Sequence, residues 1–141
     1  MDKLVCPWGV FSGIREFDMY ELSVETGFSA AHQLVGYDGN CENIHGHNWK
    51  VGVFLRVKEL NDIGIGMDFR EIKKKTDDLL SRLDHVNINR VQPFDSINPS
   101  SENIARWLYQ QLGGLLNSDN VRVSRVVVRE TDHYSVSYFE E

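Results

Sequence analysis

Two stretches of alternating apolar and polar residues, 17–32 and 45–59, place the strongest constraint on the fold of this chain. A period of two puts every second side chain on the same face of a β-strand, so both stretches are predicted to be strands. Consecutive strands joined by a short connection pair antiparallel. Residues 33–44 form that connection, and the two stretches are therefore expected to lie side by side in one sheet.

Histidines occupy the ends of the two apolar faces that meet at this connection. His32 shares the parity of the apolar residues before it, and His45 and His47 share that of the apolar residues after them. Antiparallel pairing would bring the three imidazoles together. Three protein ligands with an open position are typical of a catalytic zinc site. Isolated strand histidines are often half-buried polar residues, but this explanation would require the imidazoles of His45 and His47 to be buried side by side.

Cys41 lies four residues before His45, and its role has two interpretations. A thiolate that completes the zinc coordination would make the site structural. A thiolate near the metal but not bound to it would have a lowered pKa and would act as a base near neutral pH. The spacing alone does not distinguish these alternatives.

Two helices are predicted in the second half of the chain. Asp68, with Glu71 three residues later, is typical of a helix start. The segment from Pro99 to Glu102 predicts a second helix start, with a serine as N-cap and an acid in the first turn. Gly113 and the glycine that follows it predict the end of the second helix. The apolar residues at helical spacing are Phe69, Ile72, Leu79, Leu80 and Leu83 in the first helix, and Ile104, Trp107, Leu108, Leu112 and Leu115 in the second.

Strands are predicted over 121–129 and 134–138, which gives the order ββααββ. This order predicts one α+β domain over residues 17–141, with a four-stranded antiparallel sheet and both helices on one face. Residues 1–16 have no clear period and are expected to be an irregular arm. The open edges of such a sheet invite strand pairing between subunits.

The composition limits the classes of function. The net charge of −6 argues against a nucleic-acid-binding surface. The longest apolar stretches are too short to span a membrane. The N-terminus lacks the pattern of a signal peptide, and two cysteines make no disulfide framework, so a cytoplasmic location is expected.

Two further places carry groups suited to proton transfer or ligand binding. Asp84 and His85 follow the first helix, where a carboxylate can orient and charge an imidazole, or where both can simply cap the helix. Glu130 ends the apolar face of the strand before it. Its carboxylate is either solvated or able to accept two parallel N–H bonds from a guanidine-like edge, as in pterins.

Taken together, these motifs resemble those of the 6-pyruvoyltetrahydropterin and 6-carboxytetrahydropterin synthase family. The resemblance runs from about Phe17 to the C-terminus. The matching segments, in family order, are Phe28 to His32, Cys41 to His47, Asp62 to Phe69, Leu83 to Asn89, Pro99 to Ala105 and Val128 to Thr131.

The resemblance implies the tunnelling fold, whose members are commonly homohexamers built from two trimers with sites at subunit boundaries. It also implies a role for each site residue. These are His32, His45 and His47 as ligands of Zn²⁺, Cys41 as the proton-abstracting base, Asp84 and His85 as the second acid/base pair, and Glu130 as the pterin anchor with Glu102 as a further substrate-binding residue.

Within the family, the three residues between Cys41 and His45 resemble the carboxytetrahydropterin type. The expected reaction converts 7,8-dihydroneopterin triphosphate to 6-carboxytetrahydropterin, acetaldehyde and triphosphate on the route to queuosine. A third group of the family, tied to folate synthesis, has a glutamate near the place of the cysteine, and Cys41 beside Glu42 resembles members that combine both patterns. Formation of 6-hydroxymethyldihydropterin through Glu42 and pyruvoyltetrahydropterin formation therefore stay open. A non-catalytic zinc- or pterin-binding module is the alternative of another class. The expected partner is the small-molecule substrate, with neither nucleic acid nor membrane.

Overall fold

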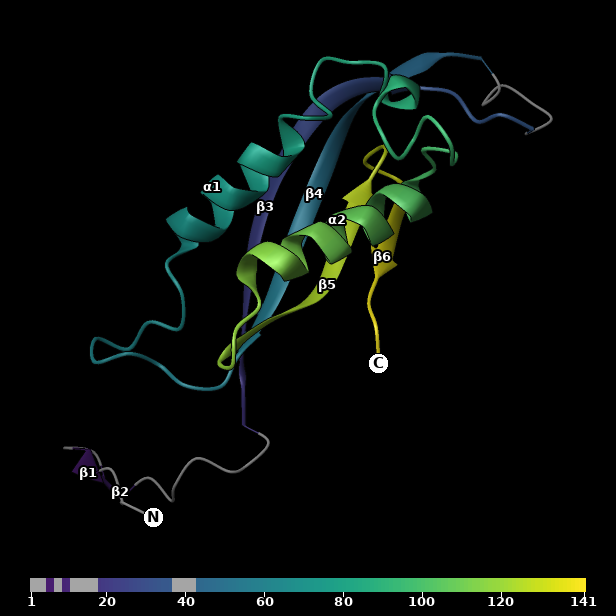
Figure 1. Cartoon of the computed structure of the whole chain (residues 1–141). Helices are drawn as coiled ribbons and strands as arrows, with labels where there is room; N and C mark the ends of the chain where they lie inside the picture. The colour runs from purple at the N-terminus through teal and green to yellow at the C-terminus, as the bar shows by residue number, and fades with distance from the viewer. Residues whose placement is uncertain (1–4, 7–8, 11–17, 37–42) are drawn as a thin grey trace.

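The computed structural model describes residues 5–6, 9–10, 18–36 and 43–141 of the chain (Figure 1). Within the predicted arm, the two-residue strands β1 (Val5–Cys6) and β2 (Gly9–Val10) pair antiparallel. The short pair differs from the wholly irregular arm that the sequence predicts. Cys41 and Glu42 lie outside the described residues, so the predictions for them stay predictions.

A four-stranded antiparallel sheet forms the centre of the domain, with the strand order β3-β4-β5-β6. In Figure 1 the two long strands β3 and β4 run side by side and curve together along most of the domain. The α+β arrangement and the order ββααββ predicted for the main domain are confirmed. The strands are β3 (Tyr20–His32), β4 (His45–Val57), β5 (Val121–Arg129) and β6 (Ser135–Tyr138).

Both helices, α1 (Phe69–Leu80) and α2 (Ser101–Leu116), lie over the same face of this sheet (Figure 1). A short 3₁₀ helix, η2 (Ile88–Arg90), interrupts the connection between them. The predicted starts are confirmed, because the side chain of Asp68 accepts a hydrogen bond from the Arg70 N–H and that of Ser100 accepts one from the Asn103 N–H. No helix among the described residues is long and apolar enough to cross a membrane.

The end of α2 differs from the prediction. Gly113 and Gly114 do not end the helix, which continues to Leu116. Leu116 is buried, whereas Leu115, predicted to be in the core, is 49% exposed. Burial of a leucine side chain stabilises by about 1.5–3 kcal/mol. This gain is comparable to the roughly 1 kcal/mol that each of the two glycines costs inside a helix.

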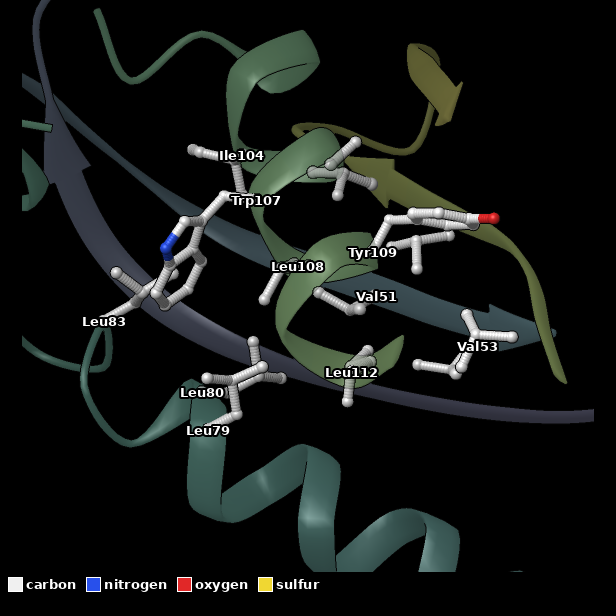
Figure 2. Packing of buried hydrophobic residues seen from close by; sticks show 14 of the residues in the cluster. Val51, Val53, Leu79, Leu80, Leu83, Ile104, Trp107, Leu108, Tyr109 and Leu112 are labelled. Carbon is white, nitrogen blue, oxygen red and sulfur yellow. The ribbon is translucent and has the colours of Figure 1, made fainter. Parts of the chain in front are cut away.

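The core lies between the helices and the sheet, and Figure 2 shows part of it. Leu80 and Leu83 come from the end of α1 and the turn after it. They belong to one cluster with Leu108 and Leu112 of α2 and with Val51 and Val53 of β4. Phe69, predicted to belong to this core, is 56% exposed at the first turn of α1. The core therefore fixes the sheet beneath the helices, and the histidine-bearing ends of β3 and β4 extend beyond α1.

Candidate metal centre and acid/base site

Three imidazoles and one carboxylate meet on the helix-covered face at one end of the sheet. In the register of β3 and β4, His32 faces His45 and Ala30 faces His47, as the alternation predicts. Glu130, the residue after β5, reaches the same point. The ligand atoms of these four side chains all lie within 4.8 Å of one another. The predicted convergence of the three histidines is therefore confirmed, and Glu130 joins them.

The backbone determines which nitrogen of each of two rings is available. The Nδ1 atoms of His32 and His45 each lie 2.7 Å from a carbonyl oxygen, that of Pro99 and of Asn43 respectively. A carbonyl only accepts, so each Nδ1 carries the proton and each Nε2 of the neutral ring carries a lone pair. Burial lowers the pKa of His32, whose side chain is 2% exposed, and keeps this ring neutral near pH 7.

These lone pairs face one another. The Nε2 atoms of His32 and His45 are 3.0 Å apart, so two rings that each carry their proton on Nδ1 bring two lone pairs together. The Nε2 of His47 is 2.6 Å from Oε1 of Glu130, yet it is a buried atom without a hydrogen bond. Buried polar atoms are normally satisfied, and a cation at this point would satisfy the acceptors that face it.

The distances fit such a cation. Two ligands of a tetrahedral ion with bonds of about 2.0–2.1 Å, the length of zinc–imidazole bonds, lie about 3.3 Å apart. Oε1 of Glu130 is 3.5 Å from Nε2 of His32 and 3.8 Å from that of His45, and the two shorter contacts are 3.0 and 2.6 Å. Two of these four distances are thus shorter and two are longer than the separation expected for two ligands of one ion. The residues present therefore fit a metal ion.

Asp84 and His85 lie at the free edge of β3. The Ser29 N–H donates to Oδ1 of Asp84 at 2.9 Å, and the His85 N–H donates to the Ser29 carbonyl oxygen at 2.6 Å. These bonds hold His85 at a positive φ of 56°, which is uncommon outside glycine. The C-cap of α1 is Ser81, so Asp84 and His85 do not cap this helix.

The Asp84–His85 pair has the geometry of an oriented imidazole. Nδ1 of His85 is 2.9 Å from Oδ1 of Asp84, and the imidazole is 80% exposed. The Ser29 N–H lowers the pKa of Asp84 below its ordinary value, and His85 lowers it further. Asp84 is therefore ionised at neutral pH and can stabilise a protonated His85. A surface hollow beside the pair is also lined by His47 and Asn48.

The sequence from residue 21 to 141 matches the family model of 6-pyruvoyl tetrahydropterin synthase. The chain belongs to this enzyme family. A relative from Synechocystis, named 6-carboxy-5,6,7,8-tetrahydropterin synthase, is 34% identical over 99 residues, which are 67% of this chain and 75% of the relative. A Pyrococcus furiosus relative, named dihydroneopterin monophosphate aldolase, is 32% identical over 111 residues, 77% of this chain and 88% of the relative.

Solved structures of 6-pyruvoyl tetrahydropterin synthases share the fold. That of Caenorhabditis elegans superposes with a TM-score of 0.79 at 25% identity, covering 91% of this chain and all of that one. The Plasmodium falciparum enzyme gives a TM-score of 0.68 at 22% identity, with 86% and 98% covered. The predicted family and its tunnelling fold are therefore confirmed.

One contact of the site in this family member was not predicted from the sequence. Ser101, the first residue of α2, donates from Oγ to Oε2 of Glu130 at 3.2 Å. The Pro99–Glu102 motif contains this serine, but its spacing predicts only a helix cap. The side chain of Glu102 is exposed and forms no hydrogen bond or ion pair with the part of the chain that the structure describes, so its substrate-binding role stays a prediction.

Proposed function

We propose that this protein is a zinc-dependent 6-carboxy-5,6,7,8-tetrahydropterin synthase of the cytoplasm. It would convert 7,8-dihydroneopterin triphosphate to 6-carboxytetrahydropterin, acetaldehyde and triphosphate, on the route to queuosine. The observation that carries the proposal is the convergence of three imidazoles and one carboxylate at a single point. The Cys41–His45 spacing and the name of the Synechocystis relative favour this reaction within the family.

His32, His45 and His47 would hold the zinc ion through Nε2. Bound zinc supplies a Lewis acid that stabilises negative charge on oxygen as protons leave carbon. The hydrogen bonds to Pro99 and Asn43 orient two of the rings, as partners of metal-binding histidines commonly do. The chain thus provides a preorganised set of ligands and needs no rearrangement of the sheet to bind the ion.

The remaining chemistry is proton transfer by side chains of the chain. Cys41 would remove a proton from the substrate side chain as a thiolate. His85 would serve the other transfers, because the carboxylate of Asp84 lies 2.9 Å from its Nδ1 and orients the ring. The exposure of His85 suits a group that exchanges protons with substrate and water.

Incubation with 7,8-dihydroneopterin triphosphate, followed by mass spectrometry of the pterin products, tests the proposed function. We expect 6-carboxytetrahydropterin as the main product, with acetaldehyde in equal amount. Zinc-free protein is the matched control and should form none. Pyruvoyltetrahydropterin as the main product would instead assign the other synthase activity, and no conversion by zinc-loaded protein would support a non-catalytic pterin- or zinc-binding module.

A second candidate function is side-chain cleavage to 6-hydroxymethyldihydropterin through Glu42. It is favoured by the glutamate directly after Cys41 and by the Pyrococcus furiosus relative, which is named as an aldolase on dihydroneopterin monophosphate. A carboxylate in place of the thiolate is a general base of lower pKa. The same product analysis distinguishes this activity, because hydroxymethyldihydropterin would then dominate.

Glu130→Gln is expected to weaken pterin binding by about tenfold to over a hundredfold in protein saturated with zinc. Loss of a charged hydrogen-bond partner costs about 1.5–3 kcal/mol, and the amide turns one acceptor into a donor. Pterin fluorescence titration would measure the change. An unchanged dissociation constant would mean that Glu130 does not accept the N–H pair of the pterin.

The protein is expected to be a homohexamer. The N-terminal part of β3 and the whole of β6 are edges of the four-stranded sheet, and exposed edges pair with other strands unless they are protected. Residues 84–87 form hydrogen bonds with the C-terminal part of β3, at Ser29 and Ala31, and therefore cover that part of its edge. Sedimentation equilibrium would measure the assembly, and an active monomer would contradict the prediction.

A further inference from the structure

We propose that Glu130 is an exchangeable fourth ligand of the metal, and that a bound pterin ring withdraws it from the ion. The inference rests on the proposed function in one respect, namely that the site takes a metal and a pterin. It adds that the two ligands compete for one carboxylate. Glu130 would thus occupy the fourth coordination position of the metal while the site lacks a pterin, and would leave this position when the pterin ring binds.

The position of Oε1 supports the closed state. This oxygen lies 2.6, 3.5 and 3.8 Å from the Nε2 atoms of His47, His32 and His45, so it faces all three proposed ligands at once. A carboxylate that merely neutralised a protonated imidazole would form a hydrogen bond, yet Nε2 of His47 has none. Carboxylate oxygen is an ordinary zinc ligand at about 2.0–2.2 Å. Oε1 of Glu130 therefore lies where a fourth ligand of the metal ion would be.

The second oxygen of Glu130 is also engaged. Oε2 accepts the hydrogen bond from Oγ of Ser101 at the start of α2, which fixes the rotation of the carboxylate. A pterin donates two parallel N–H bonds, and a single carboxylate accepts them only with both of its oxygens. The oxygen that faces the three imidazoles would thus also have to accept an N–H bond from the pterin edge. Sharing this oxygen with the pterin would weaken its bond to the metal and draw Glu130 away from the ion.

This competition for Glu130 has a measurable consequence. If a pterin weakens the hold on zinc, zinc must weaken the hold on that pterin by the same factor. Loss of a group that only supports a zinc ligand typically costs 10–100-fold in affinity, and loss of a ligand should cost at least this much. The released position would become available to the oxygens of a substrate side chain only after the ring has been recognised.

The test measures zinc affinity and does not depend on turnover. The zinc dissociation constant of the wild-type protein is determined by competition with a chromophoric chelator, with and without saturating 2-amino-4-hydroxypteridine. This pterin has no side chain at carbon 6 and brings no side-chain oxygens to the metal. A titration of chelator, zinc and pterin without protein corrects for zinc bound by the pterin itself. We expect the pterin to raise the zinc dissociation constant about tenfold or more.

Two variants complete the test. Glu130→Gln should raise the zinc dissociation constant about tenfold to a hundredfold without any pterin, whereas the control Glu59→Gln, which removes one exposed negative charge at the opposite end of β4, should leave it unchanged. Cobalt-substituted protein gives a second reading, because exchange of Glu130 for water or pterin changes the visible absorption of the ion.

The outcomes separate this inference from the proposed function. Zinc affinity that is the same with and without pterin overturns the exchange, even if the protein forms 6-carboxytetrahydropterin. Wild-type zinc affinity in Glu130→Gln overturns the ligand role and leaves Glu130 as a pterin anchor alone. If Glu130→Gln does not fold, the wild-type measurement decides. If the protein has no synthase activity but the pterin weakens zinc binding as expected, the exchange of Glu130 is supported and the proposed reaction is wrong.

Discussion

His47→Ala is expected to release zinc and abolish turnover together. The substitution removes one of three imidazoles that converge on the proposed ion, and Nε2 of His47 is the buried atom that otherwise lacks a hydrogen bond. Loss of one ligand should weaken zinc binding by a hundredfold or so, at least as much as loss of a supporting group. Elemental analysis of the purified protein and the product assay measure the two effects.

The matched control for this substitution is His133→Ala. His133 is exposed in the turn between β5 and β6 and takes no part in the cluster of metal-binding side chains. It should keep its zinc and its activity. The strand itself should persist in both variants, because Trp49 and Val51 next along β4 remain buried. A His47→Ala protein with full zinc content and full turnover would refute the metal assignment.

Cys41→Ala is expected to keep zinc and lose 6-carboxytetrahydropterin formation. The proposed protein ligands are three imidazoles and the exchangeable carboxylate of Glu130, so none of them is a thiolate, whereas proton abstraction requires a base. General-base catalysis is typically worth about 10²–10⁴-fold in rate. Zinc content and product formation are measured on the same preparation. Cys6→Ala is the control, since it removes the other cysteine of the chain, and it should leave both readings unchanged.

The product distribution of Cys41→Ala gives a sharper reading of the residue beside it. Neighbouring side chains in an extended segment point in opposite directions, so one of the two is expected to reach the substrate at a time. If Glu42 substitutes as the base, the product should shift towards 6-hydroxymethyldihydropterin. Loss of zinc together with activity would show that Cys41 is a ligand and that its role as a base is wrong.

Local periodicity was sufficient to predict the elements and the histidine cluster. A period of two assigned β3 and β4 and also their inner faces, and a slip of one residue would have turned every histidine to the other face. Hydrogen-bonding side chains at Asp68 and Ser100 marked the helix starts. Periodicity was less reliable at the helix ends. Leu115 and Leu116 are adjacent in the sequence, and which of them is buried depends on how α2 lies against the sheet.

The sequence by itself thus determined the order of elements, the shared face of His32, His45 and His47, and the family. Only the tertiary structure decided that Oε2 of Glu130 is held by Ser101 and that Ser29 holds Asp84 in place. These partners are 29 and 55 residues apart along the chain. The physical reason is that side-chain periodicity is set by the local backbone, whereas contacts between a strand end, a helix start and a connecting segment depend on how the helices pack across the sheet.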